Sequence, residues 1–524
     1  MRRVKRVATI ILAAVFIFAG AVSAREVYGL SSGTVDFYTG NALLEEWRIP
    51  EARAFVDDLM ERTPEDTSAL LLDGHVRFFE GDYKGALKRL DEVGVTGAFR
   101  ELVKVTSDIA AGFKSRSSEH FEIFWENPKD EVLAEPALEG LEASYSELSK
   151  LLGFRPEGRV RVEIYPTVAD FTAVSTLTRE EVETSGTIGL CKFNRLMITS
   201  PRATFFGYRW RDTLCHEFAH LAVFRLSGGN APIWIHEGLA RYFEGSWRGR
   251  SGRMTPFALN LLSKRYSEGT LIPLDKMSPS VAKLPSAEDT SLAFAEVGTM
   301  VSYLIEHRGG EAPRRLLAQL AEGRGDREAF SEVWGGTFAS FEEEWRQWVE
   351  KLSVPAEDLE VMGIALKDSG GEPEQGKIPD PEAKDYTRLG DMLRTRGRME
   401  AASVEYEKGF RLLPDNPAVV SKYALGRIFL GEYQAALDAV APVISLYEDR
   451  SSLWMRKGEA LLALERYDEA ASAFNELMEI NPFDEPGRVG LVRALSGSGR
   501  EEEHARAVKD LELITGGAPS GAHP

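Results

Sequence analysis

The spacing of apolar residues in the middle of the chain predicts short strands that alternate with helices. The stretch HFEIFWE places Phe121, Ile123 and Trp125 at alternate positions, as a half-buried strand does. RVRVEIYP alternates in the same way, and NRLMITSP is a further short strand that ends at Pro201. The helical pattern EVLAEPALEGLEASYSELSKLLG separates the first two strands and ends at Gly153. This order of elements predicts an α+β domain.

From about residue 384 the pattern becomes helical and repeats at intervals of 34 residues. Ala402 recurs as Ala436 and Ala470, and the two clearest copies close on the letters NP. Small residues let the two helices of a hairpin cross closely, and proline ends the second helix. These positions resemble the tetratricopeptide repeat (TPR), so residues 384–516 are expected to form an all-α TPR solenoid.

A similar pattern near the N-terminus predicts a second helical TPR-like block over residues 32–112. EARAFVDDLMERTPED resembles the second helix of a repeat that closes at Pro64, and Gly74 and Ala86 follow at the repeat spacing. An ordinary helical hairpin domain is the alternative. Residues 353–383 are rich in Gly, Pro and charge, and they are expected to be a linker before the C-terminal repeats.

Residues 1–24 have the pattern of a secretory signal peptide. MRRVKR is basic, VATIILAAVFIFAGAV is apolar, and VSA places small residues before a cleavage site that follows Ala24. The protein is therefore expected to be exported, to a bacterial periplasm or as a secreted protein. An uncleaved N-terminal membrane anchor is the alternative, although the apolar run is shorter than the roughly 20 residues of a comfortable span.

The charge of the chain argues against nucleic-acid and anionic-lipid partners. The formal net charge is -19, and the signal contributes four basic residues and no acid, so the remainder carries -23 (-19 minus 4). Such an excess of negative charge repels phosphate backbones. Contact with a membrane is expected only through the signal or anchor segment.

The chain has two cysteines, Cys191 and Cys215. In an oxidising compartment they could form a disulfide, and two buried free thiols are the alternative. Cys215 directly precedes a histidine of the motif described next. Its helical direction is away from that motif, so it is expected to belong to the core.

A metal-binding motif stands out in the helix-like run RDTLCHEFAHLAVFRL, where His216, Glu217 and His220 spell H-E-x-x-H. Imidazoles four residues apart lie on one helical face and can bind one Zn²⁺ ion. Glu217 points elsewhere, but it can reach a metal-bound water and take its proton. The motif alone is weak evidence for a metal site, because a partly exposed helix that happens to carry two histidines can show the same sequence.

A second helix begins downstream, in SGGNAPIWIHEGLARYFEG, and carries a third candidate ligand. A short turn between the helices can bring Glu237 back to the metal. His236 adjoins it and could be the ligand instead. Neighbouring residues on a helix point about 100° apart, so only one of the two is expected to reach the ion. Glu237 is favoured, and His236 is then expected to line the cleft.

The segment that carries these motifs resembles the peptidase MA-like zincins, in the gluzincin group that includes thermolysin and the aminopeptidases. HEFAH matches the active-site helix and WIHEGLARYFE matches the glutamate helix. The resemblance implies that His216, His220 and Glu237 bind one Zn²⁺ per chain and that Glu217 is the general base. It also implies a zincin-like catalytic domain over residues 116–352, in which NRLMITSP is the edge strand that binds an extended substrate.

The sequence departs from this family at the oxyanion donor. Many gluzincins carry a Tyr or His that stabilises the tetrahedral oxyanion, and in this chain the matching position is Phe294. Tyr242, Tyr208 and Tyr303 are candidates for the missing donor, and His236 could also line the cleft. Loss of one donor can slow an enzyme about 10²- to 10³-fold.

Two functions fit the sequence best, ahead of a non-peptidase hydrolase that uses the same zinc. The first is an exported zinc metallopeptidase that hydrolyses peptide bonds, with TPR blocks that bind substrate or protein partners in their grooves. The second is a TPR scaffold of an envelope complex with an inactive or weakly active zincin domain. The presence of Glu217 favours the first function, because a pure scaffold does not need it.

Overall fold

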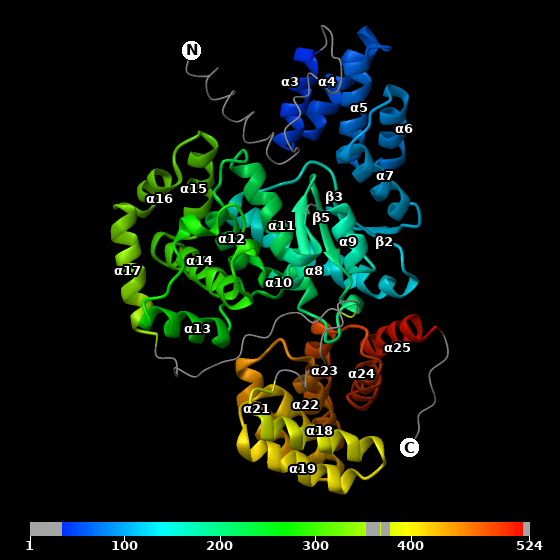
Figure 1. Ribbon diagram of the computed structural model, residues 1–524, viewed down its shortest axis with the longest axis vertical. Coiled ribbons are helices and arrows are strands. Elements are labelled where there is room, and N and C mark those ends of the chain that lie inside the picture. Colours follow the sequence, from blue (N-terminus) through cyan, green and yellow to red (C-terminus); the bar gives the residue numbers. More distant parts are fainter. Residues whose placement is uncertain (1–33, 176, 353–366, 368–377, 517–524) are drawn as a thin grey trace. The chain divides into compact units, whose positions relative to one another are not determined.

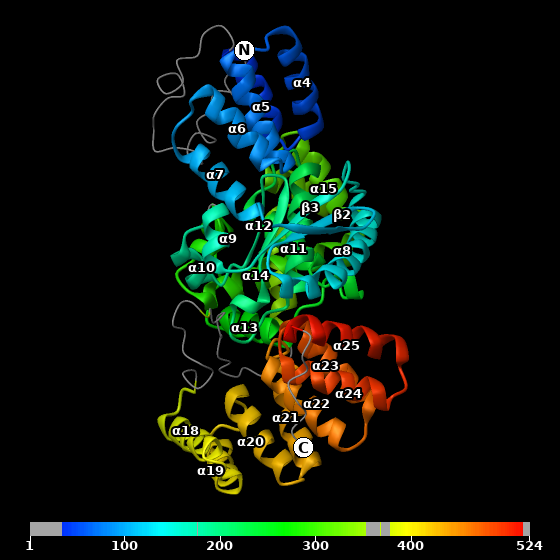
Figure 2. The same cartoon turned by 90° about the vertical axis from the view of Figure 1, so that its right-hand side faces the viewer.

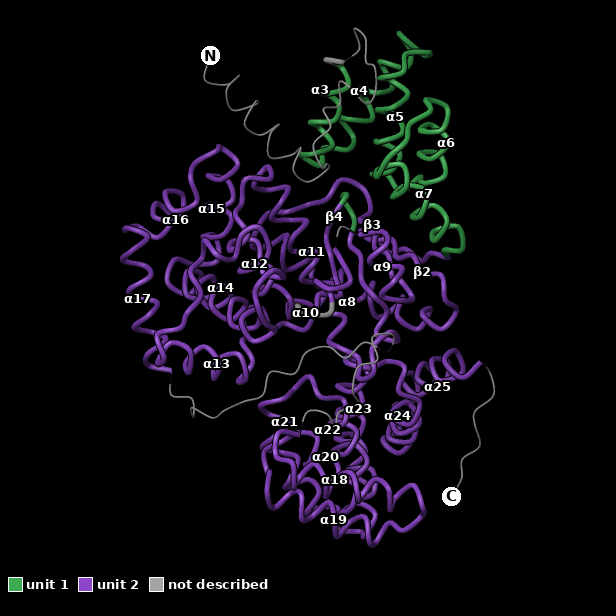
Figure 3. Tube along the Cα trace, viewed as in Figure 1, with its two compact units in different colours: residues 1–113, 193–195 green, residues 114–192, 196–524 purple. Residues whose placement is uncertain are grey.

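The computed structural model describes residues 34–175, 177–352, 367 and 378–516 (Figure 1). They fall into two compact units, Met1–Phe113 with Phe193–Arg195 and Lys114–Lys192 with Leu196–Pro524 (Figure 3). The expected signal peptide and most of the expected linker lie outside the described residues. None of the described helices has the length and apolar character needed to cross a membrane.

The first unit is built from antiparallel helices. They are α3 (Thr34–Glu45), α4 (Ile49–Arg62), α5 (Thr67–Glu80), α6 (Tyr83–Val93) and α7 (Ala98–Ala110). Asp66 starts α5 by accepting hydrogen bonds from two backbone N–H groups, and Gly81 ends it in a left-handed conformation. Helices α4 and α6 begin 34 residues apart, at Ile49 and Tyr83. The helical character agrees with the sequence pattern, and the assignment of these helices to TPRs stays a prediction.

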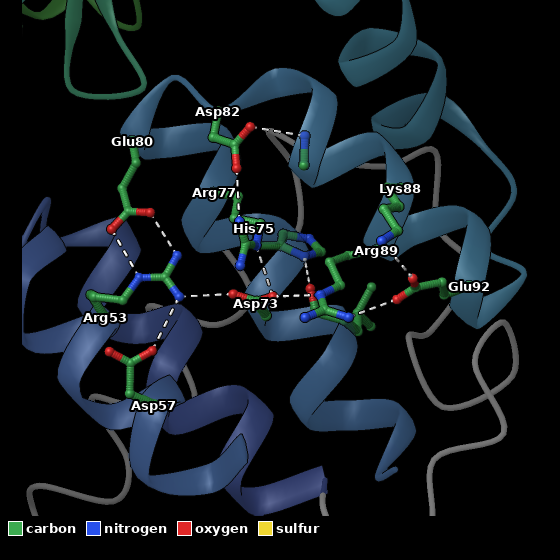
Figure 4. A network of polar contacts seen from close by, with 12 residues as sticks. Arg53, Asp57, Asp73, His75, Arg77, Glu80, Asp82, Lys88, Arg89 and Glu92 are labelled. Carbon is green, nitrogen blue, oxygen red and sulfur yellow. Dashed lines mark hydrogen bonds and ion pairs between the residues drawn. The ribbon is translucent and has the colours of Figure 1, made fainter. Parts of the chain in front are cut away.

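A buried carboxylate joins three helices of this unit (Figure 4). Asp73 of α5 accepts hydrogen bonds from Arg53 of α4 at 2.8 Å, Arg77 of α5 at 2.8 Å and Arg89 of α6 at 2.7 Å. Arg53 also forms a forked ion pair with Glu80. Burial alone would raise the pKa of Asp73, but the hydrogen bonds from the three arginines lower it below its ordinary value.

The second unit begins with a small mixed sheet. Its strands are β1 (Lys114–Ser117), β2 (Phe121–Trp125), β3 (Val160–Tyr165), β4 (Gly189–Lys192) and β5 (Arg195–Thr199), in the spatial order β1-β2-β3-β5-β4. Strands β1 and β2 are antiparallel, and β2 and β3 are parallel with Ile123 opposite Val162. The alternation of apolar residues in β2 and β3 predicted both strands correctly.

Helices make up most of the second unit around and after this sheet. They are α8 (Glu131–Leu152), α9 (Val168–Val174), α10 (Arg179–Ser185), α11 (Trp210–Leu226), α12 (Ile233–Phe243), α13 (Pro256–Ser267), α14 (Ala287–Arg308), α15 (Ala312–Ala321), α16 (Asp326–Trp334) and α17 (Phe338–Glu350). Phe121 of β2 meets Phe218 of α11 edge-on, with ring centroids 5.0 Å apart. The helix with the H-E-x-x-H motif therefore packs against the sheet.

The edge of the sheet differs from the sequence prediction. NRLMITSP forms β5, which lies between β3 and β4, so the expectation that it is an edge strand was wrong. The edge strands of the sheet are β1 and, next to β5, β4. The chain reverses at Phe193 and Asn194, which both have positive φ angles of 53° and 60°, and this two-residue turn pairs β4 with β5. β4 has only four residues and no alternating pattern, so the sequence did not reveal it.

The C-terminal part is a stack of helical hairpins (Figure 2). Its helices are α18 (Pro381–Thr395), α19 (Met399–Leu412), α20 (Pro417–Phe429), α21 (Tyr433–Leu446), α22 (Ser451–Ala463), α23 (Tyr467–Ile480), α24 (Glu485–Gly497) and α25 (Glu501–Thr515). The second helix of each hairpin begins 34 residues after the previous one, at Met399, Tyr433, Tyr467 and Glu501. A Cβ atom on Gly390 would lie 2.4 Å from the Tyr406 ring, which explains the pairing of glycine and aromatic residue in this repeat.

Replacement of Asp73 by Asn should destabilise the first unit by about 2 kcal/mol, because three arginines lose their common charged acceptor. Hydrogen exchange of α4, α5 and α6 in the full chain should then become roughly thirtyfold faster. Asp57→Asn is the matched control, since its side chain is 60% exposed and pairs only with Arg53 among the pairs described. Equal exchange in the two variants would contradict the role of Asp73.

The contribution of Asp73 to the stability of the first unit should depend on pH. The pKa of Asp73 is lower in the folded protein than the value of about 3.9 in an unfolded chain, so its stabilising effect is complete above that value and is lost as the pH falls through the folded pKa. The stability difference between wild type and Asp73→Asn should therefore be constant from neutral pH down to about pH 5 and shrink in stronger acid.

Candidate metal centre

Three side chains from two helices converge on one point. His216 and His220 lie one turn apart on α11, and their Nε2 atoms are 3.1 Å apart. Glu237 of α12 places Oε2 3.3 Å from Nε2 of His216 and 3.4 Å from Nε2 of His220. This trio is the group of metal-ligating side chains that the described residues bring together.

The spacing of these atoms fits a zinc ion. Zinc binds imidazole nitrogen and carboxylate oxygen at about 2.0–2.2 Å in tetrahedral geometry, which separates any two ligand atoms by about 3.3 Å. Oε2 of Glu237 is buried and makes no well-formed hydrogen bond within the described residues, although a buried carboxylate oxygen normally has a partner. A divalent cation would supply that partner.

The two helices are joined by a turn that explains how Glu237 reaches the histidines. Gly228 and Gly229 follow α11 with φ angles of 59° and 73°, and this region of backbone favours glycine. Pro232 then precedes α12. A Cβ atom on Gly238 would lie 2.8 Å from the carbonyl oxygen of Val297, so glycine lets α12 pack directly against α14.

Glu217 lies beside the trio and against the edge strand. It is 6% exposed, and the backbone N–H of Cys191 in β4 donates a hydrogen bond to its carboxylate. A Cβ atom on Gly189 would lie 2.8 Å from Oε1 of Glu217, so this glycine leaves the space that the carboxylate occupies. Burial raises the pKa of Glu217 above its ordinary value, and the nearby charges of His220 and His216 oppose that rise.

A further carboxylate, Glu244, supports the site and was not predicted from the sequence. Its Oε2 atom lies 3.9 Å from Nδ1 of His216, on the opposite side of the ring from the metal-facing nitrogen, and Arg241 forms an ion pair with it. Burial alone would raise the pKa of Glu244, but the charge of Arg241 and the contact with His216 lower it. Glu244 follows Glu237 by seven residues, which places both on one helical face, so this spacing could have revealed it.

Electrostatics favour a cation at this place. Burial alone would lower the pKa of His216, but Glu237 and Glu244 raise it to about 10. Burial alone would raise the pKa of Glu237, but the charge of His220 and the contact with His216 lower it well below its usual range. The carboxylates therefore keep their negative charge and attract positive charge to the space between the rings.

His236 and Phe294 form part of the surroundings. The His236 ring centroid is 5.6 Å from that of His220, and the Phe294 ring of α14 meets His216 edge-on at 6.0 Å. Burial and the charge of His220 lower the pKa of His236 to about 3. Glu237, and not His236, completes the convergent trio. A phenyl ring that cannot donate a hydrogen bond thus lies next to a candidate ligand.

The three tyrosines considered as oxyanion donors make contacts elsewhere. Tyr208 donates its hydroxyl hydrogen to the carbonyl oxygen of Thr199. The Tyr303 ring lies 3.9 Å from that of His307. Tyr242 follows Glu237 by five residues, which turns it about 140° away on α12, and its ring packs against Phe243.

The two cysteines are free thiols in the structure, so the disulfide considered from the sequence is not formed. Cys215 is buried, and its Sγ atom lies 3.9 Å from the carbonyl oxygen of Gly140 in α8. Burial raises the pKa of the Cys215 thiol to about 12. Cys215 therefore packs between helices, as its helical direction predicted, while Cys191 lies in β4 beside Glu217.

Comparison with known families agrees with the two sequence resemblances. The model of the Peptidase MA superfamily matches residues 142–351, which include α11, α12 and α14. A model of the tetratricopeptide repeat matches residues 424–485. None of the curated proteins compared with the chain matches it.

Solved structures of repeat proteins match short parts of the chain. A thermophilic TPR protein of Thermus thermophilus has 20% identity, with 25% of this chain and 74% of that chain covered and a TM-score of 0.24. The first TPR domain of the human RPAP3 protein has 20% identity, with 23% of this chain and 96% of that chain covered and a TM-score of 0.22. MamA from Desulfovibrio magneticus has 22% identity, 26% and 77% coverage and a TM-score of 0.24.

The family models and the sequence motifs agree on which segments carry which resemblance. The H-E-x-x-H helix and the glutamate helix lie inside the first matched segment, and the 34-residue periodicity lies across the second. Residues 142–351 are therefore a Peptidase MA superfamily domain, followed by tetratricopeptide repeats.

Proposed function

We propose that the protein is a zinc-dependent metallopeptidase that hydrolyses peptide bonds. The observation that carries this proposal is the convergence of His216, His220 and Glu237 within 3.4 Å of one another. Zinc, when bound there, supplies a Lewis acid that lets a water molecule lose a proton near neutral pH. Glu217 takes that proton, and its raised pKa suits a group that must then pass it to the leaving amine.

The edge strand β4 is the proposed place for the substrate. A peptide that pairs with an edge strand is bound through backbone hydrogen bonds, which do not depend on its side chains. β4 also carries Gly189 and Cys191, the two residues that adjoin Glu217. A peptide bound there would present its carbonyl groups next to the general base.

We further propose that the protein is exported and that protein partners bind to the C-terminal repeats. The export proposal rests on the signal pattern of residues 1–24.

Two hollows of about 590 and 430 Å³ lie on the repeats, and they share Leu462, Ala463 and Arg493. Phe429 borders the second hollow with 52% of its surface exposed. Exposed apolar side chains along such a groove suit a peptide or protein segment.

One observation favours a second function, a repeat scaffold with a weakly active peptidase domain. Phe294 lies against His216, and a phenyl ring cannot stabilise an oxyanion by hydrogen bonding. In that case the repeats carry the main function and the peptidase domain retains only slow hydrolysis.

The zinc content of the purified chain tests the ligand set. Wild type and His236→Ala should each contain about one zinc per chain, while Glu237→Ala should lose it, because only Glu237 completes the convergent trio. Elemental mass spectrometry measures this directly. Loss of zinc only in His236→Ala would identify the His236 imidazole as the third ligand. A wild type that holds no zinc after loading would contradict the metallopeptidase proposal and favour the repeat scaffold.

Glu217→Gln tests the catalytic step. The variant keeps the size of the side chain but cannot accept the proton, so peptide hydrolysis should fall by about 10²- to 10⁴-fold. Hydrolysis of a mixed peptide library, followed by mass spectrometry, gives the rate. The zinc content should stay unchanged, since Glu217 is not one of the convergent ligands. Equal rates in wild type and variant would remove Glu217 from the mechanism.

Phe294→Tyr tests the missing oxyanion donor. The added hydroxyl places a hydrogen-bond donor on the ring that meets His216, so kcat should rise by about 10- to 100-fold with little change in zinc content. Phe294→Leu is the control, because it changes the packing without adding a donor. A Tyr variant no faster than wild type would indicate that another group, such as His236, already fills this role.

A further inference from the structure

The last turn of α23, in the C-terminal repeats, meets the segment that leads into the candidate active-site helix. The backbone N–H of Tyr208 donates to the carbonyl oxygen of Ile480 at 2.8 Å, and Nε1 of Trp210 donates to that of Met478 at 3.4 Å. Carbonyl groups in the last turn of a helix have no partner within that helix. The peptidase domain therefore caps α23 with groups that immediately precede or begin α11.

The two backbones approach so closely that the sequence needs a glycine there. Gly207 has a φ angle of 76°, and a Cβ atom on it would lie 1.9 Å from the carbonyl oxygen of Ile480. A side chain at this position would force the two segments apart. The close approach of these two backbones therefore requires glycine at position 207.

Ion pairs strengthen the same contact. Arg209 pairs with Glu476 at 3.0 Å and also donates to the backbone carbonyl oxygen of Glu448 at 2.7 Å. Arg211 forms a forked pair with Glu479, in which both side chains are 15% exposed. Pairs with this much burial and forked geometry hold two elements more firmly than exposed surface pairs do. The acidic side chains also lie next to the positive N-terminal end of α11.

The contact lies at the start of the helix that carries the candidate ligands. Arg211 precedes His216 by five residues, which corresponds to about 7.5 Å along the helix axis. In the same turn, Asp212 accepts hydrogen bonds from Nε1 of Trp247 at 2.7 Å and from Arg248. The first turn of α11 therefore contacts both the repeats and the residues that follow α12. Because α11 is one continuous helix from Trp210 to Leu226, a shift of its first turn would also displace His216.

We propose that Glu476 and Glu479 of the repeats are positioning residues for the candidate metal centre, which act through Arg209 and Arg211 on helix α11. The repeats are then a structural part of the site as well as a surface for partners. By thermodynamic linkage, a ligand that displaces α23 weakens metal binding, and metal binding stabilises the docked arrangement of α23. This inference rests on the proposed function, since α11 carries the proposed zinc ligands.

The test compares charge reversal at two acids of α23 in the full chain. Glu479→Lys places a cation opposite Arg211 and should weaken zinc affinity by about tenfold, as loss of an outer support of a metal ligand typically does. Glu479→Gln, which keeps an acceptor oxygen, should have a smaller effect. Glu469→Lys is the matched control, because this residue of the same helix is 58% exposed and pairs with Arg466. Affinity is measured by competition with a zinc chelator, and circular dichroism verifies folding.

Hydrogen exchange of α11 supplies a second measurement that does not need metal. Glu479→Lys should accelerate exchange in residues 211–226 without metal, and Glu469→Lys should leave it unchanged. Zinc affinity and α11 exchange equal to wild type in Glu479→Lys would overturn the proposal. A wild type that binds no zinc, with faster α11 exchange in Glu479→Lys, would refute the zinc site and keep the positioning of α11 by the repeats.

Discussion

The burial of negative charge is the constraint on which the candidate site depends. Glu217, Glu237 and Glu244 are largely withdrawn from water, and an isolated carboxylate in such surroundings would cost several kcal/mol. The fold offsets this cost with local positive charge. His216 lies between Glu237 and Glu244, and Arg241 pairs with Glu244. A divalent cation bound between His216, His220 and Glu237 would add further positive charge beside these carboxylates.

The parts of the site that follow from local spacing were predictable. The separation of His216 and His220 by one turn, and the glycine-rich turn before Glu237, are properties of one short segment. The same holds for the helices of the C-terminal repeats, whose 34-residue period appears in the sequence and in the helix boundaries. Glu244 obeys the same local rule, at two helical turns from Glu237, and a search along that face would have found it.

The remaining features depend on contacts between distant parts of the chain, which local patterns do not encode. The edge position of β4 results from its turn onto β5, and a four-residue strand has too few positions to show alternation. The need for glycine at position 207 arises from Ile480, more than 270 residues later in the chain. The free state of the cysteines likewise follows from their placement in β4 and against α8.

The shortness of β4 limits how a peptide could be recognised. Four residues of strand extend over about 13 Å, and only alternate residues of an edge strand direct their N–H and C=O groups outward. Only about two residues of β4 could therefore form backbone hydrogen bonds with a bound peptide. So little pairing gives low affinity and little discrimination among sequences. Selectivity would then depend mainly on binding of the substrate protein to the repeats, which raises the concentration of its cleavable segment near β4. Side-chain pockets beside β4 would contribute less.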